Sequence, residues 1–229
     1  MTGGSPTPVE VGSHCLVEGK IEDREGVNGR YGIRFQLRMP EDWNGKSLFQ
    51  GGGGTDGFIA PAIGTIPSTG TTATPALKRG YAVVSMDGGH DGMKLDFAAD
   101  QQARLDLAYA SIGKVSNTAK ALISTLYAAP PEQSYFMGCT NGGREAMMAA
   151  QRFPLEFDGV VAGNPGFHLS RAALGGVWDV TQWAKIAPRD EMYSALRPEG
   201  LDAVAEEIDR QCDALDGLED GVVAAYRQC

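Results

Sequence analysis

The sequence predicts an α/β fold built on a parallel-rich sheet with flanking helices. Short apolar segments typical of buried strands recur from residue 31 to residue 162. Segments with apolar residues at helical spacing lie between them. A glycine-flanked turn at 138–142 joins one expected strand directly to an expected helix. Together these observations indicate strands and helices that alternate along the chain.

The first expected strand alternates apolar and polar side chains, as a half-buried strand does. The later ones are short apolar runs such as Tyr81–Ser85, typical of parallel strands covered on both faces. Residues 55–76 are rich in Gly, Pro, Ser and Thr and predict a loop. The expected strands cover residues 31–38, 47–50, 81–85, 134–137 and 158–162.

Two helices are expected among these strands. An apolar stripe predicts a long helix over about 106–128, which ends before Pro130-Pro131. Good helix formers predict a second helix over 143–152. Beyond residue 166 three helix-like segments follow, with no further core strand. We therefore expect residues 1–166 to belong to one domain and 167–229 to begin a helical insertion.

Composition excludes several classes of partner. The net charge is −9 with no basic run, so neither nucleic acid nor an anionic membrane is expected as a partner. No apolar stretch approaches the roughly 18 residues of a membrane-spanning helix. The N-terminus shows neither a charged nor an apolar signal region, so we expect no signal peptide in this chain. The four cysteines lack zinc-site spacing, which favours disulfides.

The turn Gly138–Gly142 has the pattern of a nucleophile elbow. Such a turn lifts its central side chain, here Thr140, above the edge of the sheet. The N–H of Asn141 at the helix start is then placed to donate to an oxyanion. A β-branched residue is strained at the positive φ that this turn usually requires. The alternative is that Thr140 is an ordinary turn residue without a catalytic role.

Two other features bear on the same chemistry. Gly51–Gly54 ends an expected strand; it is either a flexible turn or the source of the second oxyanion donor, from Gly52 or Gly53. His90 lies upstream of Thr140, whereas the hydrolase order places the histidine last. We therefore expect a structural or pocket-rim role for His90. Neither His14 nor His168 is a good candidate for the general base.

Residues 137–154, Met-Gly-Cys-Thr-Asn-Gly-Gly-Arg-Glu-Ala-Met-Met-Ala-Ala-Gln-Arg-Phe-Pro, followed by Phe-Asp-Gly-Val-Val-Ala-Gly-Asn-Pro at 157–165, resemble the tannase/feruloyl esterase family. The similarity extends from residues 43–45 and the glycine run to Cys229. Members of that family carry Ser where this chain has Thr140. The resemblance implies an α/β-hydrolase core that is interrupted by a helical lid domain and is incomplete at the C-terminal side of this chain.

The resemblance also implies a function, the hydrolysis of carboxylic esters of aromatic acids of the tannin, feruloyl or terephthalate type. Thr140 would occupy the nucleophile position, and the catalytic Asp and His would lie outside this chain, in a missing C-terminal segment or a second chain. Cys139 would form a disulfide to a cysteine next to that histidine. The alternative is a catalytically inactive fragment or an interaction subunit of such an esterase, which the Thr and the absent His favour.

Residues 212–222 concentrate acidic side chains and two glycines. Oxygen ligands of this kind suit Ca²⁺, although the EF-hand spacing is not met; the alternative is a solvated acidic turn. The resemblance implies a structural calcium and a Cys212–Cys229 disulfide, and together these favour a secreted or periplasmic location. Cys15 has no evident partner. The implied calcium ligands are the side chains of Asp213, Asp216 and Asp220 and the carbonyls of Leu218 and Val222.

Overall fold

The structure, a computed structural model, describes residues 10–65, 74–188, 191 and 197–229. It divides into two compact units, Met1–Phe167 and His168–Cys229. The first unit contains a β-sheet, and the second contains helices. Part of the loop expected at 55–76 lies outside the described residues. That the two units serve as a catalytic core and the beginning of a lid stays a prediction.

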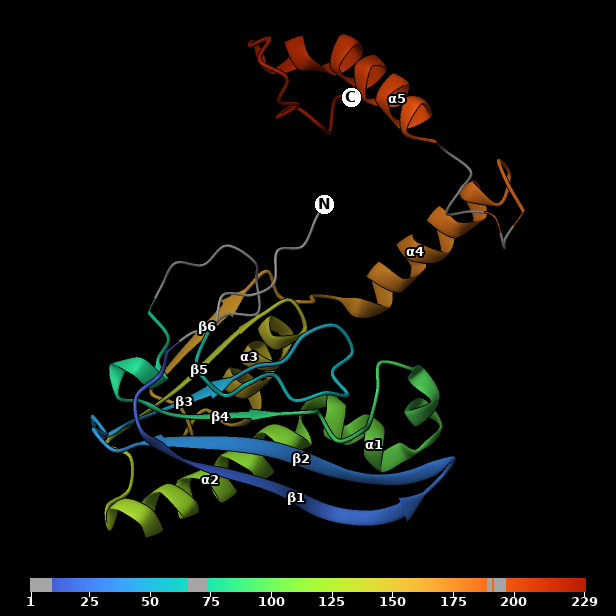
Figure 1. The fold of residues 1–229 in the computed structure, drawn as a ribbon. Helices are drawn as coiled ribbons and strands as arrows, with labels where there is room; N and C mark the ends of the chain where they lie inside the picture. The colour runs from blue at the N-terminus through green and yellow to red at the C-terminus, as the bar shows by residue number, and fades with distance from the viewer. Residues whose placement is uncertain (1–9, 66–73, 189–190, 192–196) are drawn as a thin grey trace. The chain divides into compact units, whose positions relative to one another are not determined.

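The first unit is built on a six-stranded sheet of order β1-β2-β4-β3-β5-β6 (Figure 1). β1 pairs with β2 and β2 with β4 in antiparallel fashion, whereas β4, β3, β5 and β6 run parallel. This arrangement confirms the predicted α/β fold with a parallel-rich sheet. The strands are β1 (His14–Gly26), β2 (Gly29–Pro40), β3 (Lys46–Gln50), β4 (Ala82–Met86), β5 (Gln133–Cys139) and β6 (Gly159–Gly163).

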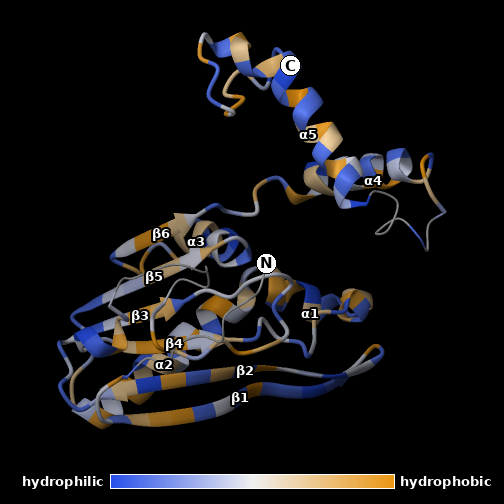
Figure 2. Cartoon of the chain, turned by 45° about the horizontal axis from the view of Figure 1, so that its top comes forward, coloured by the Kyte–Doolittle hydropathy of each residue, from blue (hydrophilic) through white to orange (hydrophobic). Residues whose placement is uncertain are grey.

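Alternation along the strands sends side chains to two separate apolar layers. On one face, Phe49, Val84 and Phe136 pack with the helices α2 (Ser111–Tyr127) and α3 (Asn141–Arg152). On the other face, Leu48 and Val83 pack against the segment between β3 and β4. Apolar and polar bands also alternate along β2 in Figure 2. The sheet is therefore held from both sides, and its central strands have fixed registers.

The helical region before β5 is longer and less regular than the sequence predicts. It begins with α1 (Gln101–Leu105) and passes through one π-helical turn, η3 (Asp106–Ala110), into α2. The stripe of apolar residues predicted one regular helix over 106–128. A π-helical turn inserts one residue into the helix and leaves backbone carbonyls without their usual partners. The carbonyls of this turn are used by the candidate site.

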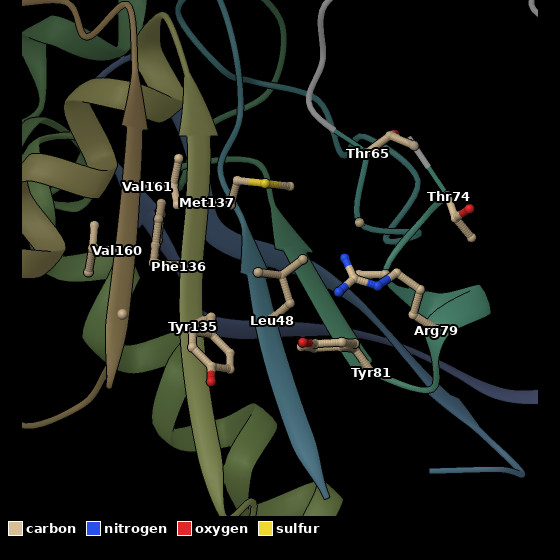
Figure 3. Close-up of a pocket in the computed structure, with 13 residues that line it drawn as sticks. Leu48, Thr65, Thr74, Arg79, Tyr81, Tyr135, Phe136, Met137, Val160 and Val161 are labelled. Atoms are coloured by element: carbon tan, nitrogen blue, oxygen red, sulfur yellow. The ribbon is translucent and has the colours of Figure 1, made fainter. Parts of the chain in front are cut away.

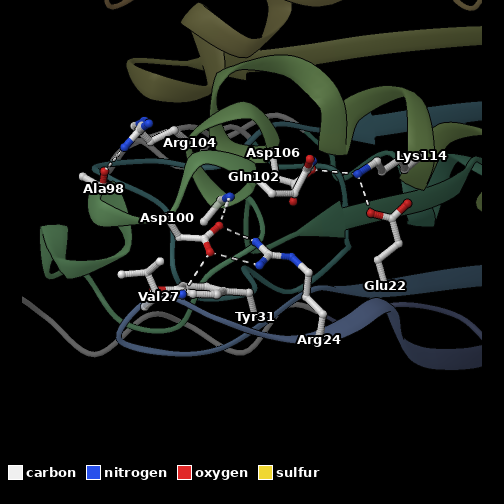
Figure 4. A network of polar contacts seen from close by, with 11 residues as sticks. Glu22, Arg24, Val27, Tyr31, Ala98, Asp100, Gln102, Arg104, Asp106 and Lys114 are labelled. Carbon is white, nitrogen blue, oxygen red and sulfur yellow. Dashed lines mark hydrogen bonds and ion pairs between the residues drawn. The ribbon is translucent and has the colours of Figure 1, made fainter.

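A polar network joins the β1–β2 hairpin to α1 (Figure 4). Asp100 caps α1 by accepting the Ala103 N–H, and it forms a bidentate ion pair with Arg24. It also accepts the N–H of Val27 in the hairpin loop. The buried Asp100 carboxylate thus binds the start of a helix, an arginine and a hairpin loop at once. The ion pair therefore links the hairpin to α1.

The second unit contains α4 (Leu169–Trp183), α5 (Pro198–Cys212) and the 3₁₀ turn η5 (Asp213–Asp216). A disulfide joins Cys212 to Cys229 across 17 residues, which confirms the pairing that the family resemblance implies. Of the three helix-like segments expected after residue 166, α4 and α5 lie in the described ranges, and residues 189–190 and 192–196 lie outside them. No helix in the described ranges is long and apolar enough to cross a membrane.

Candidate active site

Thr140 occupies a sharp turn between the end of β5 and the first residue of α3. Its backbone dihedrals are φ 55° and ψ −113°, a strained conformation for a β-branched residue. The Thr140 N–H donates to the Gly163 carbonyl at 3.0 Å, and the Thr140 carbonyl accepts the Gly166 N–H at 3.0 Å. The last residue of β6 and the loop that follows it thus bind the backbone of Thr140 through both its N–H and its carbonyl.

The glycines around Thr140 are required by close backbone approach. A Cβ on Gly138 would lie 2.2 Å from the Gly142 carbonyl oxygen. A Cβ on Gly142 would lie 2.6 Å from the oxygen of Gly52, and one on Gly143 would lie 2.3 Å from the oxygen of Gly163. Since these neighbours are backbone atoms that cannot rotate away, the Gly-x-Thr-x-Gly-Gly pattern follows from packing between strand, helix and loops.

Asn141 presents the first N–H of α3 beside the Thr140 side chain. The Asn141 N–H donates to Oγ1 of Thr140 at 2.6 Å, so the expected oxyanion donor lies next to the expected nucleophile. The Asn141 side chain is fixed in turn, because its Oδ1 accepts from Nε of Arg144 at 2.6 Å. The same guanidinium donates to the carbonyls of Leu107 and Ala108 in the π-helical turn. Sequence reasoning missed this use of Arg144.

The glycine run Gly51–Gly54 lies against the same turn. The Gly51 N–H donates to the Met137 carbonyl at 2.9 Å, and the Gly52 carbonyl accepts the Gly142 N–H at 3.1 Å. The N–H of Gly52 donates to Oε2 of Glu145 at 2.9 Å, and that of Gly53 to Oδ1 of Asp56 at 3.1 Å. The loop is next to Thr140, but both N–H groups have carboxyl partners. Their role as oxyanion donors stays a prediction.

Glu145 is a site residue that sequence reasoning missed, because it fits the pattern of an ordinary helix former. Its side chain is buried on the inner face of α3, 1% exposed. Burial and then the neighbouring Asp56 carboxylate raise the pKa of Glu145 well above its usual value. The available signal was an acidic residue between small residues, Gly142 and Ala149, that share its helix face.

The histidines of the first unit have other partners. His90 is 3% exposed, its Nε2 bonds to the carbonyl of Thr55 at 2.8 Å, and its ring stacks on Phe97 at 3.9 Å. His14 lies at the start of β1 and bonds to Gly12 and Arg38. Neither ring bonds to Thr140, and the geometry of His90 agrees with a structural role.

The family model for tannase and feruloyl esterase matches residues 15–229. The chain belongs to this family. It is 40% identical over 232 residues to mono(2-hydroxyethyl) terephthalate hydrolase of Piscinibacter sakaiensis, with 94% of this chain and 38% of that protein covered. It is 32% identical over 215 residues to a probable feruloyl esterase of Arthroderma benhamiae, with 89% of this chain and 37% of that protein covered.

Solved structures of related esterases share the fold of this family member. Feruloyl esterase B from Aspergillus oryzae matches with a TM-score of 0.69 at 25% identity, over 96% of this chain and 46% of that chain. Another esterase from Aspergillus oryzae matches with a TM-score of 0.71 at 26% identity, over 92% and 38%. The chain spans about two fifths of the length of the curated relatives it matches. These neighbours confirm an α/β-hydrolase-type fold.

The acidic loop expected to bind calcium lies in the second unit of this family member. Its carboxylates accept backbone N–H groups: Asp213 from Gly221, Asp216 from Leu218 and Ala224, and Asp220 from Val222. Across the described ranges, no group of three His, Cys, Asp or Glu side chains is arranged to hold a metal ion. The calcium site, with the carbonyls of Leu218 and Val222, stays a prediction.

A largely apolar cavity of about 440 Å³ lies on the sheet face opposite α2 (Figure 3). Leu48, Tyr135 and Met137 line it from the strands, and Arg79 and Tyr81 line it from the neighbouring segment. None of the residues that line it belongs to the Gly138–Gly142 turn. Thr140 is therefore not among the residues that line this cavity.

Proposed function

We propose that this chain is part of a carboxylic ester hydrolase that acts on esters of aromatic acids, with Thr140 as the nucleophile. The strained conformation of Thr140 between β5 and α3 carries this proposal. A turn of this kind presents a side-chain oxygen at the sheet edge beside the N-terminus of a helix. Membership of the tannase and feruloyl esterase family supports the same assignment.

In this mechanism Oγ1 of Thr140 forms a bond to the ester carbonyl carbon, and its proton passes to a general base. The carbonyl oxygen becomes an oxyanion, which the Asn141 N–H and one N–H of Gly52 or Gly53 stabilise. Collapse of this intermediate expels the protonated alcohol, and water then releases the acid. The histidine base and its aspartate partner would come from a segment outside these 229 residues or from a second chain.

The substrate class rests on the relatives. One is named a mono(2-hydroxyethyl) terephthalate hydrolase and others are named probable feruloyl esterases. Esters of terephthalate, ferulate or gallate share an aromatic ring conjugated to the carbonyl that is attacked. We expect this ring to be the part of the substrate that related enzymes, and this one, have in common.

Two features of the second unit extend the proposal. The Cys212–Cys229 disulfide supports a secreted or periplasmic location, because disulfides persist in oxidising compartments. A structural Ca²⁺ would be held by Asp213, Asp216 and Asp220, whose oxygens suit a hard cation. Each of these carboxylates now accepts backbone N–H groups, yet a carboxylate has further lone pairs for a cation. The donor chemistry therefore fits calcium.

The test uses the intact protein that carries these residues, assayed with methyl ferulate, methyl gallate and mono(2-hydroxyethyl) terephthalate. Replacement of Thr140 by Ser removes the methyl group that crowds the attacking oxygen, and we expect kcat to rise at least tenfold. Thr140→Ala should abolish hydrolysis. A Thr140→Ser variant that is folded and hydrolyses none of the three esters would contradict the esterase proposal.

The second candidate is a catalytically inactive fragment or interaction subunit of such an esterase. The observation that favours it is the threonine itself, whose β-branched side chain is strained at φ 55°. This candidate predicts no hydrolysis by the wild-type protein. Partial recovery of activity in Thr140→Ser alone would support it and would still leave the elbow assignment intact.

A further inference from the structure

Two buried carboxyl groups, those of Glu145 and Asp56, meet beneath the glycine run. Each side chain is 1% exposed. One oxygen of each holds the loop, since Oε2 of Glu145 accepts the Gly52 N–H and Oδ1 of Asp56 accepts the Gly53 N–H. The other two oxygens, Oε1 of Glu145 and Oδ2 of Asp56, are buried and have no donor among the described residues.

The two carboxyl groups are neighbours, because the N–H groups that they accept belong to the successive residues Gly52 and Gly53. Two ionised carboxylates cannot share a hydrogen bond, because neither has a proton to donate. Two adjacent negative charges out of water also repel each other strongly. A single proton on one carboxyl removes both problems, because it supplies the missing donor and cancels one charge. In agreement, burial and the neighbouring Asp56 raise the pKa of Glu145.

The charged groups around this pair do not satisfy the two remaining oxygens. Arg144 lies next in sequence on α3, but its guanidinium donates to Asn141 and to the π-helical turn. From the loop after β4, Asp87 is paired with Arg34 at 2.6 Å. His90, from the same loop, bonds through Nε2 to the Thr55 carbonyl. Among the groups of the described residues, a proton within the pair is the remaining donor.

We propose that Glu145 and Asp56 share one proton, held between Oε1 and Oδ2, and that this acid–carboxylate pair fixes the Gly51–Gly53 loop against the Thr140 turn. Both are positioning residues for the proposed ester hydrolysis, on which the inference about positioning rests. Their effect passes through the backbone, because the Gly52 carbonyl accepts the Gly142 N–H. The loop has no room to shift inward, since a Cβ on Gly51 would already lie 2.8 Å from Gly142 Cα.

The first test follows unfolding of the intact protein by urea at several pH values. Glu145→Gln keeps an acceptor for Gly52 and a permanent donor for Asp56, but it does not titrate. In the wild type, the folding equilibrium constant should fall by up to about tenfold per pH unit as pH rises above the usual glutamate pKa. Glu145→Gln should lose the part of this slope that comes from Glu145, whereas Asp87, whose pKa burial also raises, keeps its own part. The control is Glu41→Gln, an exposed site, which should keep the wild-type slope.

The second test detects the proton directly. Infrared spectra of the wild type at neutral pH should contain the C=O stretch of a protonated carboxyl group. This band should be missing in Glu145→Gln and should change in frequency in Asp56→Asn, where Glu145 stays buried but loses its carboxyl partner. A wild-type protein without such a band, or an unchanged pH slope in folded Glu145→Gln, overturns the proposal. If one variant fails to fold, a band left unchanged in the other also contradicts the proposal.

A third measurement separates positioning from folding. Where the intact protein hydrolyses ester, Glu145→Ala should lower kcat more than tenfold, whereas Glu145→Gln should restore most of it at unchanged KM. Equal losses in the two variants contradict the positioning role. Failure of the proposed function appears as the absence of hydrolysis in wild type and Thr140→Ser alike. The pH slope and the infrared band need no turnover, so they remain decisive in that case.

Discussion

Arg144 holds Asn141 by a 2.6 Å hydrogen bond from Nε to Oδ1, while its two terminal nitrogens hold the π-helical turn of η3. One guanidinium thus joins the residue after the nucleophile to backbone carbonyls more than 30 positions earlier in the chain. A planar fork with several fixed donors suits this role, and an ammonium group does not. The Arg144 side chain therefore fixes Asn141, the candidate oxyanion donor, relative to the π-helical turn.

Replacement of Arg144 by Lys should destabilise the protein by about 1–3 kcal/mol, because the partly buried carbonyls of Leu107 and Ala108 lose their donors. It should also reduce ester hydrolysis, since Asn141 loses its anchor. Urea unfolding and steady-state kinetics measure the two effects. The matched control is Arg152→Lys on the same helix, where the guanidinium stacks on Tyr109 and the change should cost less than about 1 kcal/mol. Equal effects at the two positions would contradict the assignment.

Gly143→Ala should be poorly tolerated, because its Cβ would meet the Gly163 oxygen at 2.3 Å and Pro165 Cα at 2.8 Å. Overpacking against backbone costs about 1–3 kcal/mol or more. Gly53→Ala is the control, since its Cβ has nothing within 4 Å and its N–H is kept. That variant should be near neutral in thermal unfolding. A Gly143→Ala protein as stable as wild type would show that the strand, helix and loop are less tightly packed.

Asp100 should make the first unit sensitive to acid. Its hydrogen bonds with Arg24 and then with Ala103 hold its pKa well below the usual range. A lowered pKa stabilises the fold above the usual aspartate value of about 3.9, and this contribution is lost as pH falls toward the lower folded value. Asp100→Asn should therefore be less stable than wild type at pH 7, with the gap closing in acid. Asp42→Asn, at an exposed site, should show no such convergence in urea midpoints.

Calcium removal should lower the melting temperature of the second unit. At a free Ca²⁺ concentration about 100 times the dissociation constant, bound Ca²⁺ stabilises the folded state by about 2.7 kcal/mol. Chelation removes this stabilisation. Added Ca²⁺ should restore the melting temperature, and Asp216→Asn should remove the response. Asp202→Asn on α5, an exposed site, should keep it. No response to chelator, with Asp216→Asn still destabilising, would mean that the carboxylates only bind backbone N–H groups.

The central strands and the Thr140 turn could be predicted because their signals are local. Each parallel strand is a short apolar run, and the turn has its glycines at fixed spacing. β1 was missed because its pattern is interrupted: the register shifts between Ile21 and Arg24, where Glu22 adopts a positive φ. An edge strand with many exposed side chains also lacks a clear apolar alternation.

The Glu145–Asp56 pair was missed for a different reason. Glu145 fits a helix pattern, and Asp56 fits a glycine-rich loop, so neither stands out within its own segment. Their contact depends on β3 and β5 being neighbours in the sheet, which brings the two segments together. The same holds for Arg144, whose partners in η3 become visible only once the helical region is seen to contain a π-helical turn.

The conformation of the turn is set by its neighbours and not by the residue at position 140. The backbone bonds from Gly163 and Gly166, together with the three close glycine contacts, are all independent of the Thr140 side chain. Serine, cysteine or alanine can therefore occupy the position on the same backbone. The backbone of the turn and its reactive side chain are therefore independent of each other. One substitution at position 140 can change the chemistry of the site while the conformation of the turn stays the same.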